Sequence, residues 1–400
     1  MGRVFDFTRY SLGLDAMKRR EFIKFSASLT LAGATPWASS AQPPQTKRLL
    51  VIMLRGGMDG LAAIPPFADP DLGSLRSELM PSNLLLGDQF FGIHPALPTF
   101  AEFMAAGQAT AIHATGFGYT GRSHFEGQDI MQSGITKPYA SASGWLGRAM
   151  RAAQSKGGVA ISIPMPLILR GDAASETQYP SWMQAPPKAT YELVSELWAN
   201  VPELKPYASR LIASDNVRLA ADGTPEPNQQ RRTAYSLAKE AAQKMQSPSG
   251  PVVGVLDFNG FDTHAGQGAA EGVNATKLKQ IDDAIKGYRE GIGDKWAQSL
   301  VITVTEFGRT ASVNGTLGTD HGWGSCILAA GGLVKAKGIV SQWPGLKKTQ
   351  LFEGRDLKVT VDALVVYADA LQSIFALPPE VIQKEVFSYA RDSLESRLFV

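Results

Sequence analysis

The chain has 400 residues, of which 44% are hydrophobic, and its 39 Lys and Arg against 37 Asp and Glu give a net charge of +2. This near balance indicates neither a nucleic acid nor an anionic membrane surface as a partner. Cys326 is the only cysteine, which excludes intrachain disulfides and metal sites built from several thiolates.

The start of the chain is predicted to be an export signal rather than part of the fold. The pair Arg19-Arg20 lies in residues 18–24 and precedes the apolar residues 25–34, and small residues at 39–41 offer a cleavage site. The apolar stretch is too short for a membrane span, which needs about 20 residues. We therefore expect residues 1–41 to be a twin-arginine signal peptide, with Met17 as an alternative start.

The mature protein is then expected to be periplasmic or secreted, without a stable membrane span. We predict that residues 42–400 form a single α/β hydrolase-like domain, with an elaborated loop region near residues 171–190. The oligomeric state is left open.

Strand-like and helix-like segments alternate along the rest of the chain. The continuous apolar run at residues 49–54 is typical of a strand buried on both faces. The alternation predicts a doubly wound, mostly parallel α/β sheet flanked by helices. The predicted strands are residues 49–54, 109–114, 159–163, 252–258, 299–305 and 325–330, and the predicted helices are residues 97–106, 123–132, 145–154, 191–199, 229–246 and 275–296.

Acids and histidines lie where the predicted strands end or begin. In parallel α/β sheets a ligand binds beyond the carboxyl ends of the strands, so loops there can bring such side chains together. Carboxylates and imidazoles can hold a divalent cation, with Zn²⁺, Mg²⁺, Mn²⁺ and Ca²⁺ all open. The predicted metal ligands are Asp59, Asp262, His264, Glu306, Asp320 and His321.

These side chains have structural alternatives. Asp59 can shape its glycine-rich turn, and Asp262 and Asp320 can stabilise loop turns. Glu306 ends an apolar strand, where an unpaired charge is costly, and Arg309 is available as its partner.

Ser123 is predicted to begin the helix at residues 123–132, with Glu126 three residues later completing a capping box. A hydroxyl at a helix N-terminus lies near free backbone N–H groups, which suit a phosphate or sulfate group. A metal nearby would activate Ser123 as a nucleophile, with Arg122 or His124 contacting the anion. The alternative is that Ser123 is only a helix cap.

Several motifs together resemble the exported bacterial family of unknown function numbered fifteen-oh-one, over residues 48–375. That family is regarded as a distant relative of the alkaline phosphatase and sulfatase superfamily, so the resemblance implies a metal-dependent hydrolase fold. The motifs are the twin-arginine start, RGGMDGL at 55–61, RSHF at 122–125, GWLGR at 144–148, FDTH at 261–264, TEFGRT at 305–310 and DHG at 320–322.

The resemblance also implies roles for individual residues. Asp59 matches the first Asp of the superfamily, and Ser123 matches its nucleophile. Asp262 with His264 and, later, His321 match its metal ligands. Glu306 is followed by Phe307 where the superfamily commonly has Asp-His, so one imidazole ligand is missing from the pattern.

These observations lead to an exported metal-dependent hydrolase of small or polymeric phosphate or sulfate esters as the first hypothesis. The rival is a non-catalytic periplasmic binding or assembly protein on the same scaffold, with residues 171–190 as its contact surface. A weaker alternative is a polysaccharide-binding protein, because Trp182 and Trp323 lie in loops and can stack on sugar rings.

Overall fold

The computed structural model describes residues 46–155, 157–162, 164–171, 175–178, 188–202, 204–205, 233–387 and 397–400. The predicted signal peptide and Trp182 lie outside these residues, as do most of the predicted loop region at 171–190 and the first four residues of the predicted helix at 229–246.

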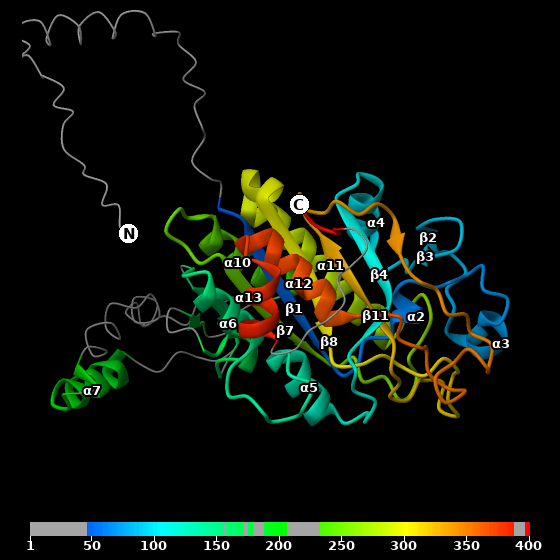
Figure 1. Cartoon of the computed structure of the whole chain (residues 1–400), viewed down its shortest axis with the longest axis horizontal. Coiled ribbons are helices and arrows are strands. Elements are labelled where there is room, and N and C mark those ends of the chain that lie inside the picture. The colour runs from blue at the N-terminus through cyan, green and yellow to red at the C-terminus, as the bar shows by residue number, and fades with distance from the viewer. Residues whose placement is uncertain are drawn as a thin grey trace, which may run out of the picture. The chain divides into compact units, whose positions relative to one another are not determined.

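The described chain is organised around a nine-stranded sheet whose order is β10-β4-β9-β8-β1-β7-β5-β6, with β11 beside β4. The central strand β1 pairs in parallel with β7 on one side and with β8 on the other (Figure 1). The strands are β1 (Arg48–Arg55), β4 (Ala109–Gly116), β5 (Gly158–Ile161), β6 (Glu176–Thr177), β7 (Val253–Asn259), β8 (Ser299–Thr305), β9 (Ser325–Ala330), β10 (Ile339–Val340) and β11 (Val361–Asp362).

The central strand is buried on both faces, as its unbroken apolar sequence predicts. Leu49, Val51 and Met53 pack into one hydrophobic cluster, and the alternate residues Leu50 and Ile52 pack into a second cluster across the sheet. Side chains of a strand point alternately to its two faces, so both faces of the sheet need a cover of helices.

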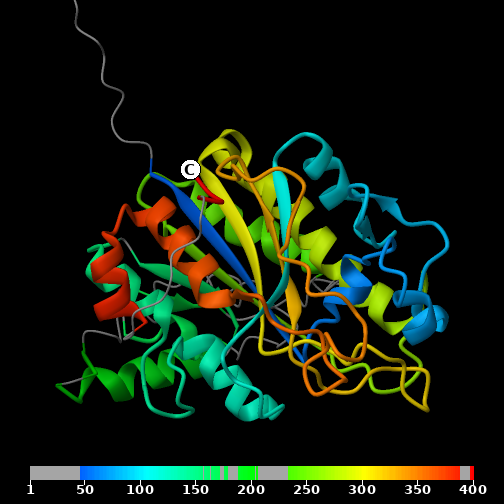
Figure 2. The same cartoon turned by 45° about the vertical axis from the view of Figure 1, so that its right-hand side comes forward.

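Helices supply that cover on each face (Figures 1 and 2). One cluster contains side chains of α5 (His124–Ser133), α6 (Trp145–Ala152) and α12 (Ala363–Phe375). The other contains side chains of α4 (Pro98–Ala105), α10 (Ala234–Gln246) and α11 (Val273–Ile292). The prediction of a mostly parallel sheet flanked by helices is confirmed.

The smaller elements were not predicted, and neither was α12. Strands of two residues are too short to show any hydrophobic periodicity, and the apolar sequence of α12 does not distinguish a helix from a buried strand. Within the described residues, no helix is both long and apolar enough to cross a membrane. The small unpredicted elements include α2 (Gly60–Ala63), α3 (Leu72–Arg76), α13 (Pro379–Val381) and the antiparallel pair β2 (Leu85–Leu86) and β3 (Gly92–Ile93), whereas α7 (Lys188–Ala199) contains the helix predicted at residues 191–199.

Strand β9 runs against its neighbours, because it pairs antiparallel with both β4 and β8. The beginning of β9 therefore lies at the sheet edge where β1, β7 and β8 end. The loop between β8 and β9 starts and finishes at this edge, so residues before β9 can meet residues after β1 and β7.

The start of α12, which Asp362 caps, provides the first test of this fold. The Asp362 carboxylate accepts a hydrogen bond from the Leu364 N–H at 2.9 Å, and burial raises the pKa of Asp362 from 3.8 to about 6. Between these values the folded protein holds a proton that the unfolded chain has lost. Stability is therefore lost as the pH rises through this window, by up to about 3 kcal/mol.

The substitution Asp362→Asn keeps an acceptor at the cap and does not titrate. We expect the variant to gain free energy of unfolding relative to the wild type between pH 4 and about 7, as measured by urea unfolding at several pH values. The change Asp294→Asn, at an exposed residue, is the control. A difference between Asp362→Asn and the wild type that does not change with pH would contradict the prediction.

Candidate metal centre

Three histidines converge on one carboxylate where β1, β7 and β8 end and β9 begins. Asp262 Oδ1 lies 2.9 Å from His264 Nε2 and 3.2 Å from His321 Nε2, and Asp262 Oδ2 lies 3.3 Å from His124 Nε2. The Nε2 atoms of His264 and His321 are 3.0 Å apart. Ligand atoms of His124, Asp262 and His321 all lie within 4.8 Å of one another.

Each of these side chains comes from an element end at this edge. His124 is the first residue of α5, Asp262 and His264 follow β7, and His321 precedes β9. The turn after β1 allows the loop after β7 to approach closely, because Gly56 has a φ of +118° and a Cβ there would lie 2.4 Å from the Asp262 nitrogen.

In each of these three histidines, the other ring nitrogen, Nδ1, contacts an oxygen acceptor. The Nδ1 atoms lie 2.9 Å from Glu306 Oε1 for His124, 3.1 Å from Asp320 Oδ1 for His264, and 2.8 Å from the Arg122 carbonyl for His321. Carbonyl and ionised carboxylate oxygens only accept, so Nδ1 carries the hydrogen in each ring. The three Nε2 atoms are then left with lone pairs.

Three lone pairs that face a carboxylate repel one another unless a cation or protons lie between them. His124 Nε2 is buried and has no hydrogen-bond partner, although it lies close to Asp262. Imidazole nitrogens with one carboxylate suit Zn²⁺, and histidine ligands held at the other nitrogen by an acceptor are typical of metal sites. The donor set therefore fits a divalent metal ion.

The ionisation of Asp262 and His321 agrees with this assignment, whereas the raised pKa of His124 favours its protonated form. Burial would raise the pKa of Asp262, but the hydrogen bond and charge of Arg309 outweigh it and hold this pKa below its ordinary value. Burial lowers the pKa of His321. The hydrogen bond to Glu306 raises the pKa of His124 in spite of burial. An ionised Asp262 and a neutral His321 are the forms that bind metal.

Glu306 and Asp320, both predicted as ligands, lie behind the histidines. Glu306 Oε1 accepts from the Gly56 N–H at 2.8 Å and from Gln128 Nε2 at 3.1 Å as well as from His124. Asp320 Oδ1 accepts from Asn314 Nδ2 at 3.1 Å in addition to His264. Glu306 Oε1 and Asp320 Oδ1 therefore orient the imidazoles of His124 and His264 and do not face the Nε2 atoms.

Arg309 does not pair with Glu306. Its Nη1 donates to Asp262 Oδ1 at 2.6 Å and to the Gly56 carbonyl at 3.2 Å, and its other nitrogens donate to Thr319. Arg309 is buried, so the structure places a fixed internal cation beside the shared carboxylate.

Asp59, also predicted as a ligand, is not among the side chains that gather around Asp262. Its Oδ1 accepts from Arg76 Nη1 at 2.9 Å and from the Ala62 N–H at 3.1 Å, and its Oδ2 accepts from Gln267 Nε2 at 2.6 Å. Asp59 is 1% exposed and Arg76 is fully buried. Both oxygens are thus occupied by protein donors.

Ser123 stands at the N-cap of α5, as predicted, but its side chain makes no capping hydrogen bond. The predicted capping box is wrong, because Glu126 instead accepts from the Tyr119 hydroxyl at 2.6 Å. The Arg122 guanidinium, predicted to contact an anion, donates to Asp356 and Glu353, each at 2.6 Å. Arg122 contacts the histidine cluster through its backbone carbonyl, which lies near His321, and not through its guanidinium.

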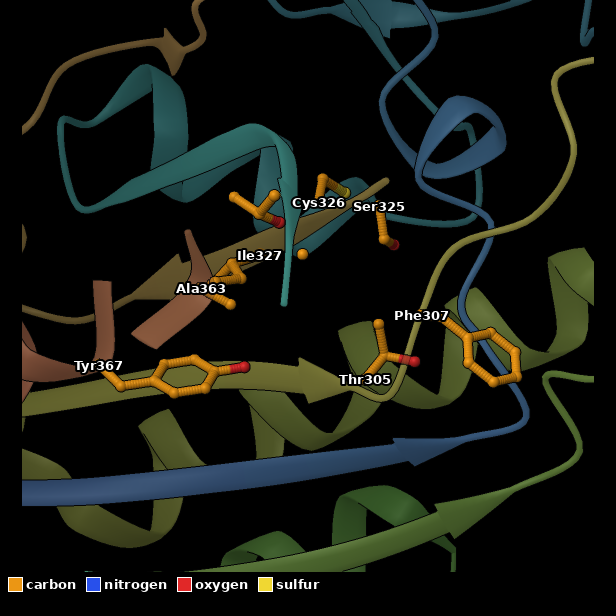
Figure 3. Close-up of a pocket in the computed structure, with 9 residues that line it drawn as sticks. Thr305, Phe307, Ser325, Cys326, Ile327, Ala363 and Tyr367 are labelled. Carbon is orange, nitrogen blue, oxygen red and sulfur yellow. The ribbon is translucent and has the colours of Figure 1, made fainter. Parts of the chain in front are cut away.

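Phe307 closes the inner side of the cluster. Its ring centroid lies 4.9 Å from that of His124 and 5.0 Å from that of His321. Phe307 also lines a small cavity together with Thr305 and Tyr367 (Figure 3). The volume within which the centre of a water molecule can move there is about 10 Å³. Such a space holds no more than about one water, so this cavity is too small for a substrate.

The structure brings together Asp262, His264 and His321, which the sequence predicts as metal ligands, and adds His124, to which the sequence analysis gave a different role. The signal available for His124 was its place in the RSHF motif at a helix start, at the same sheet edge as the other two histidines. The contact of Arg309 with Asp262 carried no sequence signal, because the two lie 47 residues apart in the chain.

The comparisons with known proteins support the resemblance stated from the motifs. Residues 206–385 match a family described as "Protein of unknown function (DUF1501)". The resemblance to this family is confirmed over these residues. None of the curated protein sequences matches the chain.

Among solved structures, Ps i-CgsB in complex with k-i-k-neocarrahexaose has 10% identity and a TM-score of 0.43, over 85% of this chain and 74% of that one. The phosphonate monoester hydrolase SpPMH from Silicibacter pomeroyi has 8% identity and a TM-score of 0.41, over 87% and 78%. A protein in the alkaline phosphatase superfamily from Vibrio parahaemolyticus has 11% identity and a TM-score of 0.39, over 83% and 67%. Their likeness to this chain concerns the arrangement of sheet and helices alone.

The buried Asp59–Arg76 pair gives a direct test of the role of Asp59. Removing one partner of a buried ion pair leaves the other charge uncompensated, so Asp59→Asn should lower the free energy of unfolding by about 3 kcal/mol. We expect the metal content per folded chain, measured by mass spectrometry, to be unchanged. Loss of metal from a variant that keeps its stability would show instead that Asp59 is a ligand.

Proposed function

We propose that the protein binds a divalent metal ion between His124, Asp262, His264 and His321 and hydrolyses phosphate or sulfate esters. The observation that carries the proposal is the orientation of the three imidazoles. Each donates through Nδ1 to a protein oxygen and turns Nε2 toward the Asp262 carboxylate.

A divalent cation bound there would act as a Lewis acid and stabilise negative charge that develops on the ester. Asp262 and the imidazoles would hold it, while Glu306 and Asp320 keep the rings of His124 and His264 oriented.

Ser123 is the proposed nucleophile. It precedes His124 at the N-terminus of α5, and its side chain is not used to cap the helix. Attack of the hydroxyl oxygen on the phosphorus or sulfur atom forms one bond and breaks the bond to the ester oxygen, and the hydroxyl proton leaves with the alcohol. Hydrolysis of the resulting enzyme ester by water restores the serine.

The exposure of the cluster to solvent bears on the size of the ester that it could bind. The side chains of His264 and Asp320 are 45% and 49% exposed, so the outer side of the centre is open to solvent. This openness is compatible with esters of large or polymeric alcohols. Export through the twin-arginine signal, to the periplasm or beyond, is part of the proposal and rests on the sequence of residues 18–41.

One observation favours the rival, a non-catalytic periplasmic binding or assembly protein. The guanidinium predicted to contact the anion, that of Arg122, is paired with Asp356 and Glu353. A substrate anion would then have to be held by the metal and by backbone N–H groups at the start of α5.

Metal content is the first test of this proposal. Protein exported through its own signal should contain about one divalent ion per chain by mass spectrometry, because the four converging side chains form one donor set. The double variant Asp262→Ala/His321→Ala should lose the ion, whereas the surface variant Asp283→Ala should keep it. An exported wild type without stoichiometric metal would overturn the proposed centre.

The second test concerns Ser123. On a panel of phosphate monoesters, phosphate diesters and sulfate esters, Ser123→Ala should lower kcat by about a thousandfold or more while retaining the metal. The nearby exposed change Thr120→Ala should be without effect. Full activity of Ser123→Ala would sink the nucleophile assignment, and a metal-loaded wild type inactive on the whole panel would favour the binding protein.

A further inference from the structure

Arg122 has an unusual backbone at the point where the chain enters the cluster. Its φ is +57°, in the left-handed region that residues other than glycine rarely adopt. A conformation of this kind persists only where the surroundings enforce it, and such residues gather at functional sites. Arg122 immediately precedes Ser123 and His124, and its carbonyl contacts His321.

We propose that Arg122 is a positioning residue whose side chain is clamped by Asp356 and Glu353 so that its left-handed backbone presents the carbonyl to His321. The role deepens the proposed function and rests on its metal centre. Arg122 thus acts through its peptide group, and its charge serves the clamp rather than a substrate.

The clamp is built from a buried and an exposed acid. Arg122 Nε and Nη2 donate to Asp356 Oδ2 at 3.0 and 2.6 Å, and Nη2 also donates to Glu353 Oε2 at 2.6 Å. The side chain of Asp356 is fully buried, whereas that of Glu353 is 56% exposed. Asp356 is therefore the fixed point of the clamp.

The segment that carries the clamp also holds His321 from the other side. Arg355 Nη2 donates to the His321 carbonyl at 2.9 Å, and Arg355 Nη1 lies 3.2 Å from Asp356 Oδ1. The backbone of Asp356 is itself fixed by mutual hydrogen bonds with Phe352 of 2.9 and 3.0 Å. Both residues of the contact between the Arg122 carbonyl and His321 are thus tied to one short turn.

This contact decides which nitrogen of His321 is available to a metal. With the hydrogen on Nδ1 and donated to Arg122, the Nε2 lone pair faces Asp262 at 3.2 Å and His264 at 3.0 Å. Without the carbonyl, a hydrogen on Nε2 could instead be donated to Asp262. The ring would then be unable to bind a metal through Nε2.

The tautomer can be read by NMR in the metal-free protein labelled with ¹⁵N-histidine, since the chain has only five histidines. In the wild type we expect His321 to carry its hydrogen on Nδ1. Arg122→Ala removes the clamp and disfavours the left-handed backbone, so His321 should shift toward the Nε2-protonated form. Arg122→Gly also removes the clamp but permits that backbone, so it should shift less. Asp356→Asn should resemble Arg122→Ala, and the exposed change Thr120→Ala, outside the clamp, should stay near the wild type.

Zn²⁺ affinity gives the second readout. Arg122→Ala should weaken binding by about 10- to 100-fold, the usual effect of losing an outer contact to a ligand histidine, with Arg122→Gly between it and the wild type. Wild-type tautomer and affinity in folded Arg122→Ala and Asp356→Asn would overturn the inference. If Arg122→Ala does not fold, Asp356→Asn decides alone.

The same measurements separate this inference from the proposed function. If the His321 tautomer shifts as expected but the wild type binds no Zn²⁺, the positioning role stands and the metal centre fails. If the wild type binds Zn²⁺ and the variants bind it equally with an unchanged tautomer, the metal centre stands and the positioning role fails.

Discussion

The sharing of one carboxylate by three imidazoles is the interaction on which the site depends. Asp262 can accept this arrangement because every imidazole is held from behind, by Glu306, Asp320 or the Arg122 carbonyl. Those outer contacts fix the hydrogen on Nδ1 and leave Nε2 free, so the histidines are prepared for a cation before one arrives. Arg309 donates to Asp262 Oδ1, and its permanent positive charge keeps Asp262 ionised.

The reversed strand β9 makes this convergence possible. In a fully parallel sheet, a loop that precedes a strand lies at the opposite edge from loops that follow strands. Because β9 is antiparallel to β8 and β4, His321 comes back to the edge where Asp262 and His264 leave β7. Close backbone approaches, such as that of Gly56 to Asp262, then bring the loops within hydrogen-bond distance.

Much of this could be predicted from sequence, because apolar runs identify buried strands and polar residues at their ends identify the ligand edge. Asp262, His264 and His321 were predicted in that way to share one site, and the structure places them together. The partner of a buried acid is a different matter, since it depends on tertiary contacts. Asp59 looked like a ligand, but Arg76, which pairs with it, lies on a short helix without a sequence signal. Arg122 looked like an anion contact, but its acids lie more than 230 residues further along the chain.

The ligand side chains are unequally enclosed, with consequences for exchange. His124 and His321 are 26% and 24% exposed and pack against Phe307, whereas His264 is 45% exposed. In the proposed metal centre, the enclosed histidines would therefore stay in place, and a chelator or an incoming ligand would displace the more exposed His264 first.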